Sequence, residues 1–333
     1  MIVYHKINVY VNVNKNAWPP YSRAKRVCDK MRTWLTCPNP AHARIVSLEA
    51  RLMLPSLLLM QGCNTMHSTH STLSSLVERA LTGNQRPLEF YLRDQSRLPG
   101  PRANLELVND LSYLLAALSA EQPDKVQSVL NYLISDDRSK VMSNTPAEFV
   151  MLCGIVAFGA CAAAQPKWRG EVFELLEQYA CNTCWRVRQG VEIAFQRVLT
   201  AAPQETISFL AIMAIHGNYF QQRAAIAAIA EPALLFSPET VQAALSMQNV
   251  VLERLHSAPA IDRKREDFRV LRQTLGYALS VITAVVPEKG FALMRNCANW
   301  GDADITWILR ENLKKKRLAK FVEYTEGLSK LLA

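Results

Sequence analysis

Several features that define whole classes of protein are scarce in this 333-residue chain. Its 12 glycines exclude a collagen-like or low-complexity protein. Its 8 cysteines are too few for a disulfide-dense scaffold. No apolar run reaches the roughly 18–20 residues that a membrane-spanning helix needs. These absences leave a globular protein that is long enough to bury a core without disulfide bonds.

Catalytic motifs are missing as well. The chain has no phosphate-binding glycine loop, no dinucleotide-binding G-x-G-x-x-G after a strand, no G-x-S-x-G and no H-E-x-x-H. Beyond residue 70, only His216 and His256 are available for a histidine-based triad. We therefore expect no catalytic residue and no cofactor, and we favour a non-catalytic role.

Metal and redox chemistry have weak candidates. Cys181 and Cys184 form a lone C-x-x-C, without the strand that precedes a thioredoxin-like motif. A zinc site would need two more ligands, and His216 is isolated. Cys37 and His42 do not complete a set either. We expect core or turn cysteines and no metal site.

The net charge of +9 is unevenly distributed. Residues 1–65 hold nine basic and two acidic side chains, whereas the rest holds 29 basic and 27 acidic ones. A basic surplus attracts nucleic acids or anionic membrane surfaces. Here that inference belongs mainly to the N-terminal segment, because residues 66–333 are nearly neutral.

The N-terminal segment, 1–65, has no sustained hydrophobic period, and prolines interrupt it. We predict a basic extension that is disordered or mis-assigned, with translation starting at Met66. A lipoprotein-type signal ending at Cys63 is the alternative, because the apolar stretch Leu52–Met60 precedes that cysteine. The domain organisation expected is thus 1–65 as an extension and 66–333 as the folded domain.

From residue 72 onward the hydrophobic period is helical, beginning with a stripe at Leu73, Leu76, Val77, Ala80 and Leu81. Prolines and capping residues predict where the next helices begin. We expect helices from Pro101 to about Ala120, from Pro123 to Leu133, and over 146–164 after a Thr145-Pro146-Ala147-Glu148 capping box, with further starts at Pro166, Pro203, Pro238 and Pro287. Strand signals are nearly absent, so the fold class is all-α.

One motif recurs along the body: an aromatic residue, two residues, an arginine, two further residues, and then an aliphatic residue. Its copies contain Trp185 and Arg188, Phe220 and Arg223, Phe268 shifted by one before Arg272, and Trp307 and Arg310. Each copy should start the second helix of a pair, with first helices near 168–180, 204–216, 238–256 and 287–298. The third unit needs an insertion near 257–264.

Paired helices that repeat every 35–50 residues resemble HEAT repeats, an armadillo-type α-solenoid family. The resemblance covers about 145–318 and extends weakly back to 72. It implies a curved solenoid of about five to seven helix pairs, in which stacking buries a continuous core.

The recurring arginines allow two interpretations. They are structural, bonding carbonyls or acids of the next unit, or they form a ligand-facing row suited to phosphates or acidic peptides. We favour the structural role. The aromatic partner should be buried, so Trp185→Ala should cost roughly 3–5 kcal/mol.

The C-terminal region carries a second cluster. Asp302 looks like an N-cap, and Asp304 favours a helix N-terminus. Lys314, Lys315, Lys316 and Arg317 are either favourable charges at a helix end or a phosphate-contacting patch.

The second alternative is suggested by a distant resemblance to DNA alkylation repair glycosylases built on HEAT-like repeats. In that comparison Trp307 and Asp304 would be the tryptophan and aspartate that surround an alkylated base.

Together these patterns favour a cytoplasmic, non-catalytic scaffold that binds a protein partner. The alternative is a DNA-binding, alkylpurine glycosylase-like protein on the same architecture. A nearly neutral body counts against a broad groove for duplex DNA.

Overall fold

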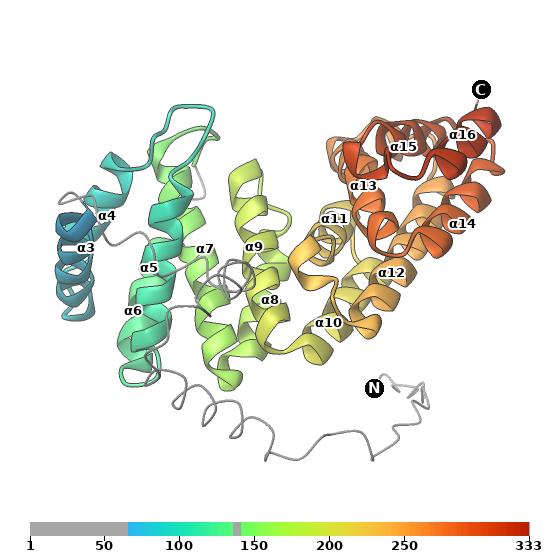
Figure 1. The fold of residues 1–333 in the computed structure, drawn as a ribbon. Helices are drawn as coiled ribbons and strands as arrows, with labels where there is room; N and C mark the ends of the chain where they lie inside the picture. Colours follow the sequence, from blue (N-terminus) through green and yellow to red (C-terminus); the bar gives the residue numbers. More distant parts are fainter. Residues whose placement is uncertain (1–65, 136–140, 333) are drawn as a thin grey trace, which may run out of the picture. The chain divides into compact units, whose positions relative to one another are not determined.

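The computed structural model describes residues 66–135 and 141–332, which belong to the second of two units of the chain, Thr65–Ala333. Over those residues the regular structure is helical and contains no strand, which confirms the all-α prediction (Figure 1). The helices are α3 (Met66–Leu81), α4 (Arg86–Asp94), α5 (Leu105–Leu118), α6 (Pro123–Leu133), α7 (Pro146–Ala164), α8 (Arg169–Tyr179), α9 (Trp185–Ala201), α10 (Pro203–His216), α11 (Tyr219–Ile229), α12 (Pro238–His256), α13 (Glu266–Val285), α14 (Pro287–Ala298), α15 (Ala303–Leu313) and α16 (Val322–Leu331). Short 3₁₀ turns occupy Pro166–Trp168, Pro232–Leu234, Asp262–Lys264 and Lys316–Leu318.

Proline positions predicted helix starts well. Five helices begin with proline as their first residue: α6, α7, α10, α12 and α14. Proline suits this position because the first amide of a helix has no intrahelical acceptor and the ring fixes a helical φ. Pro166 instead opens a 3₁₀ turn that leads into α8. The four predicted first helices of the pairs correspond to α8, α10, α12 and α14.

The predicted start at Pro101 is wrong. Helix α5 begins at Leu105, because the side chain of Asn104 accepts a hydrogen bond from the backbone N–H of Leu107 at 3.3 Å. The amide of Asn104 also donates to the carbonyl of Gln95 at 2.9 Å. Pro101 therefore lies in the loop that Asn104 closes.

The capping box expected at the start of α7 forms only in part. Thr145 Oγ1 accepts from the backbone N–H of Glu148 at 3.4 Å, as predicted. The Glu148 carboxylate, however, accepts from the N–H of Asn144 and pairs with Arg186 at 3.2 Å. A buried cation on a distant helix has taken the carboxylate that the local motif would use.

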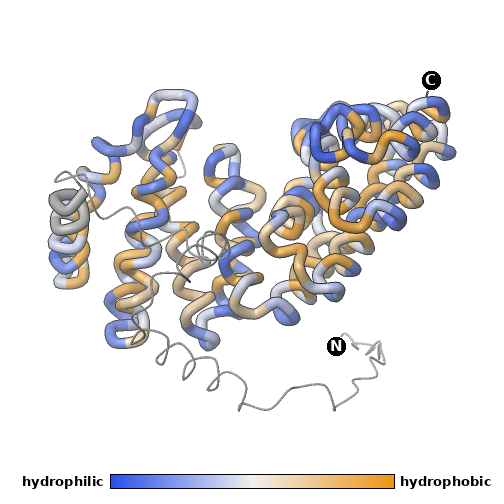
Figure 2. The backbone as a smooth tube through the Cα atoms, viewed as in Figure 1, coloured by the Kyte–Doolittle hydropathy of each residue, from blue (hydrophilic) through white to orange (hydrophobic). Residues whose placement is uncertain are grey.

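Helices pack in a regular alternation after α5. Helices α5, α7, α9, α11, α13 and α15 each pack against the next member of this series, and we call them the odd-helix layer. Helices α10, α12, α14 and α16 form a second series, and each packs on odd-helix neighbours as well. Buried apolar side chains run continuously through this array. Figure 2 shows hydrophilic residues gathered at the turns between helices.

Helix α7 is apolar on all sides because it is enclosed by neighbours. It is long and apolar enough to cross a membrane, yet 83% of its most apolar window is buried inside the protein, as in a core helix. Its small residues permit close contact: a Cβ added at Gly159 would lie 2.5 Å from Ala194 Cα on α9. The backbones of α7 and α9 can approach this closely only with glycine at 159.

Candidate interaction face

Two of the recurring arginines link consecutive odd helices. Arg188 on α9 donates to the carbonyls of Asn182 at 2.7 Å and Thr183 at 3.1 Å, and its guanidinium lies 4.6 Å from the Phe220 ring centre on α11. Arg223 on α11 donates back to the carbonyl of Arg188 at 2.9 Å. Each side chain thus contacts the neighbouring unit.

The charge of Arg223 is compensated by an acidic side chain of the neighbouring helix. Its Nη2 lies 2.8 Å from Glu192 on α9. Burial raises the pKa of Glu192 even though Arg223 opposes that effect. Burial, reinforced by the nearby Arg223 cation, lowers the pKa of Arg188. This part of the face is a packed, mixed-charge surface rather than an open row of cations.

The C-terminal side holds the Asp304 cluster, made of Arg263, Arg272, Asp302, Asp304 and Trp307. Asp304 bonds Arg272 and also accepts from Arg263 at 2.8 Å. The guanidinium of Arg272 stacks 4.4 Å from the Trp307 ring centre. Asp302 caps α15 through the N–H groups of residues 304 and 305 and pairs with Arg263 at 2.7 Å. Asp304 is therefore saturated by arginines of this protein.

The pKa of Asp302 reflects competing effects. Burial would raise it, but hydrogen bonds from Arg263 and from the backbone N–H of Ile305 outweigh burial and hold the pKa below its ordinary value. His256, which ends α12, lies 3.4 Å from Asp302 and stacks on Trp300 with ring centres 5.1 Å apart. The predicted N-cap at Asp302 is confirmed.

Trp307 lies later in its helix than predicted. It is the fifth residue of α15, which begins at Ala303, rather than its first. Together with Arg310 and Lys314 it lines an open hollow of about 430 Å³ beside α16. Arg310 donates to the carbonyl of Leu332, so it ties α15 to the C-terminal helix.

The basic run after α15, Lys314 to Arg317, forms few salt bridges with the described residues. Lys314 pairs with Glu311 at 2.5 Å. Lys315, Lys316 and Arg317 have no salt bridge with any residue of the described part of the chain, and the last two are exposed. This short patch lies at one end of the array.

Trp185 is not the buried aromatic that the repeat predicted. It is the first residue of α9, and 46% of it is exposed. Arg186, rather than Arg188, stacks on it at 4.4 Å. Arg186 is itself buried, because it reaches Glu148 and the carbonyl of Gly100 at 2.8 Å. Position 185 is thus a partly open ring over a buried ion pair.

Most cysteines of the described residues are buried. Cys184 is buried, with its Sγ 3.2 Å from the carbonyl of Val141, while Cys181 is exposed. Burial raises the pKa of the Cys161 and Cys297 thiols to about 12. Across the described residues, no group of three His, Cys, Asp or Glu side chains is placed to hold a metal ion.

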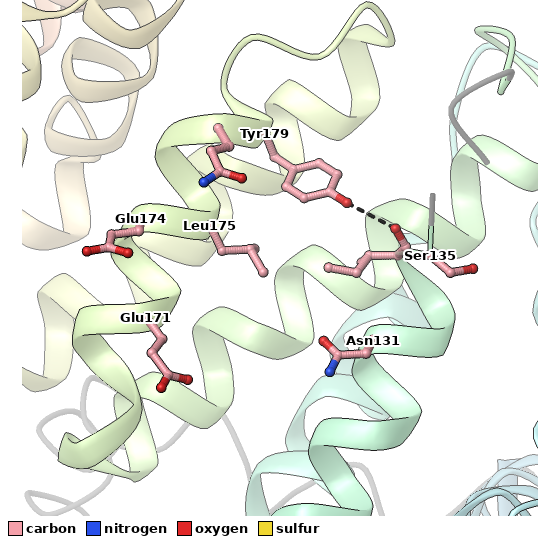
Figure 3. Close-up of a pocket in the computed structure, with 8 residues that line it drawn as sticks. Asn131, Ser135, Glu171, Glu174, Leu175 and Tyr179 are labelled. Atoms are coloured by element: carbon pink, nitrogen blue, oxygen red, sulfur yellow. Dashed lines mark hydrogen bonds between the residues drawn. The ribbon is translucent and has the colours of Figure 1, made fainter. Parts of the chain in front are cut away.

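A separate hollow of about 360 Å³ opens between α6 and α8 (Figure 3). Glu171 and Glu174 line it from α8, and the hydroxyl of Tyr179 donates to the carbonyl of Ile134 at 3.0 Å. The hollow is shallow and acidic, and none of the residues singled out from sequence lies in it. Its two glutamates belong to no group of three possible metal ligands within the described residues.

The structure thus brings Arg272, Asp304 and Trp307 together, whereas Arg310 and Lys314 share the neighbouring hollow. Sequence reasoning missed Arg186 and Arg263, which lie outside the repeat positions. It also missed Arg197 on α9, which reaches Asn109 and Tyr113 on α5. No local motif marks these pairs, because their partners are up to 88 residues away.

Comparisons with known proteins do not assign this chain to a family. No family model matches it, and no curated protein matches it. Among solved structures it is similar to an engineered protein crystallised by the Northeast Structural Genomics Consortium, at 14% sequence identity and a TM-score of 0.35. The match covers 78% of this chain and 97% of the other. A likeness of this size supports neither a fold family nor a function.

Proposed function

We propose that residues 66–333 are a HEAT-like α-solenoid that binds a protein partner without catalysis, in the cytoplasm. The binding surface would be the exposed side of the odd-helix layer, which we call the odd-helix face. The alternating helix packing supports a repeat architecture, in which each pair buries its apolar side against the next.

One observation carries the choice of a protein partner. Three arginines of the odd helices, Arg186, Arg223 and Arg272, are neutralised from within by Glu148, Glu192 and Asp304. The same layer exposes the aromatic rings of Tyr113 and Trp185. Mixed charge with exposed aromatic and arginine side chains is the composition of protein interfaces, whereas duplex DNA requires an extended surplus of cations.

Photo-crosslinking tests this proposal. Benzoylphenylalanine would replace Trp185 or Gln273, both exposed on odd helices, in the full chain expressed in its own cells. The matched control position is Ile212, an exposed apolar residue on α10. We expect the same discrete protein adduct from the two odd-helix positions and none from the control. Adducts from Ile212 alone, or from none of the three, would reject the odd-helix face.

DNA binding with alkylbase release is the second candidate, favoured by the unpaired charges of Lys315, Lys316 and Arg317. Two arginines already occupy Asp304, so it would be a poor partner for a cationic base. A salt titration of full-chain binding to a short duplex separates the candidates. Steeply salt-dependent binding that weakens in Lys315→Glu/Lys316→Glu supports DNA. Binding unchanged in that variant assigns the affinity to other basic residues.

A further inference from the structure

Positive charge in residues 66–333 is concentrated at the C-terminal end. Residues 310–332 contain seven basic and three acidic side chains, whereas residues 66–309 contain 22 basic and 24 acidic ones. Between Lys314 and Lys320, five of seven residues are basic and none is acidic. The basic surplus of residues 66–333 therefore comes from one short segment, which joins α15 to α16.

This segment is folded into consecutive tight turns that the core holds in place. The backbone N–H of Leu318 donates to the carbonyl of Lys315 at 2.9 Å, and that of Phe321 donates to the carbonyl of Leu318 at 3.0 Å. The Leu318 side chain is fully buried. The Phe321 ring packs against Phe291 on α14, with ring centres 5.9 Å apart. The two apolar side chains fix the turns, so the charged side chains between them are presented from a rigid base.

The outward side chains of these turns lie close together, and we call them the C-terminal patch. All are exposed or half-buried: Lys314, Lys315, Lys316, Arg317, Lys320 and Val322. Among the described residues, only Lys314 of this set forms a salt bridge, with Glu311. Val322, the first residue of α16, is 55% exposed and follows Lys320 by two residues. The patch thus combines dense positive charge, open to solvent, with an exposed apolar side chain.

An anionic lipid surface fits this combination better than duplex DNA does. Basic side chains are attracted to acidic headgroups, and an apolar side chain beside them gains free energy by entering the boundary below the headgroups. The phosphate backbone of DNA offers Val322 no such environment, and a duplex needs cations spread along many phosphates. The C-terminal patch is short and lies at one end of the helix array (Figure 1). A flat surface can meet this end and engage all of its cations together.

We infer that the C-terminal patch binds the surface of membranes that contain anionic phospholipids. The lysines and Arg317 attract the phosphate and carboxylate groups of the headgroups, and Val322 enters the boundary below them. Such an attachment is peripheral, so it is reversible and weakens as the salt concentration rises. The inference goes beyond the proposed function, because it concerns a lipid partner and a patch outside the positions that crosslinking tests.

The first test is co-sedimentation of the full chain with vesicles of phosphatidylcholine, with and without an equal amount of phosphatidylserine. We expect binding only with phosphatidylserine, and Lys315→Glu/Lys316→Glu should weaken it by at least about tenfold. Lys125→Glu/Lys167→Glu is the matched control, because it makes the same charge change at two exposed lysines of α6 and the turn before α8. Equal losses in the two variants would assign binding to overall charge and overturn the inference, as would no binding to the acidic vesicles.

The second test places Val322 relative to the lipid. Benzoylphenylalanine at position 322 should crosslink to an acyl chain, and intact mass should then rise by one phospholipid. Phe90 on α4, 74% exposed, is the matched control position and should give no lipid adduct. Vesicle-bound protein without an adduct at position 322, or with adducts at position 90 instead, would overturn the inference.

The third test compares lipid with nucleic acid at equal phosphate concentration and equal salt. We expect the unaltered chain to bind the phosphatidylserine vesicles more tightly than a short DNA duplex. Tighter binding to the duplex that is lost in Lys315→Glu/Lys316→Glu would assign the patch to nucleic acid and overturn the inference. Thermal unfolding of each variant confirms that a loss of binding does not reflect a loss of fold.

Discussion

Two clusters in this protein contain the same kinds of side chain, a carboxylate, an arginine and a tryptophan, but differ in their solvent exposure. In the Glu148 cluster, a carboxylate on α7 pairs with Arg186, which lies against Trp185 on α9. In the Asp304 cluster, a carboxylate on α15 pairs with Arg272 on α13, which lies against Trp307. The arginine–tryptophan distance is 4.4 Å in both. The side chains of Glu148 and Arg186 are 0% and 3% exposed, whereas those of Asp304 and Arg272 are 15% and 30% exposed.

The difference teaches that burial, rather than the contact itself, sets what each pair contributes. Water can solvate the Asp304 cluster when a partner is lost, and Arg263 provides a second cation there. Neither compensation is open to the Glu148 cluster. Its carboxylate also accepts from the backbone N–H of Arg186 at 3.1 Å, so its loss strands several donors at once.

The largest expected effect is therefore at Glu148. Glu148→Gln should destabilise the fold by about 3–5 kcal/mol, because it leaves Arg186 charged, buried and unpaired. Denaturant unfolding of the full chain measures this. Glu205→Gln is the control, since its bridge to Arg169 is half exposed and should be worth less than about 1 kcal/mol. Equal losses in the two variants would refute the role assigned to burial.

Asp304→Asn should have an intermediate effect of about 1–2 kcal/mol, because it weakens charge-assisted bonds to Arg263 and Arg272 in a partly solvated setting. The same denaturant measurement applies. A loss matching that of Glu148→Gln would mean that the two clusters are energetically equivalent despite their different exposure.

Trp185→Ala should cost about 1–2 kcal/mol, less than the roughly 3–5 kcal/mol for a buried aromatic. The reason is that almost half of the ring is in water. Trp168→Ala, at a buried tryptophan, is the control and should show the full loss. If the two tryptophan variants unfold at the same denaturant concentration, Trp185 is more deeply packed than its exposure indicates.

Acid should weaken the Asp304 cluster through Asp302. Because the folded pKa of Asp302 lies below its unfolded value near 3.9, its contribution is complete above about pH 4 and is lost as pH falls through the folded pKa. Glu192 has the opposite sign, since its raised pKa makes protonation favour the folded state. Asp302→Asn should flatten the acid limb of a stability–pH profile. A parallel limb in this variant would contradict the assignment.

The smallest effect is expected outside both clusters. Lys315→Glu with Lys316→Glu should change stability by no more than about 0.5 kcal/mol, because neither lysine forms a salt bridge with a described acid and neither side chain is buried. Thermal unfolding checks this. A large fall in Tm would show that the basic run stabilises the end of α15.

Much of the local structure could be read from the sequence for a physical reason. Proline at 123, 146, 203, 238 and 287 restricts φ in a way that favours a helix start, whatever the rest of the chain does. The cap at Asp302 is likewise local, since its carboxylate reaches amides two and three residues ahead. Pro101 was misassigned because Asn104 makes a cap that also depends on Gln95, across a loop.

The sequence by itself determined the all-helical class, most helix starts and the helix pairing after residue 166, because these depend on hydrophobic period and on interactions within a few residues. Only the tertiary structure decided which distant partner each buried or half-buried arginine meets. Arg186 meets Glu148 across 38 residues, and Arg197 meets Asn109 across 88. Such partners are set by how the helices pack, and exposure of Trp185 is decided in the same way. Short-range patterns carry no information about either.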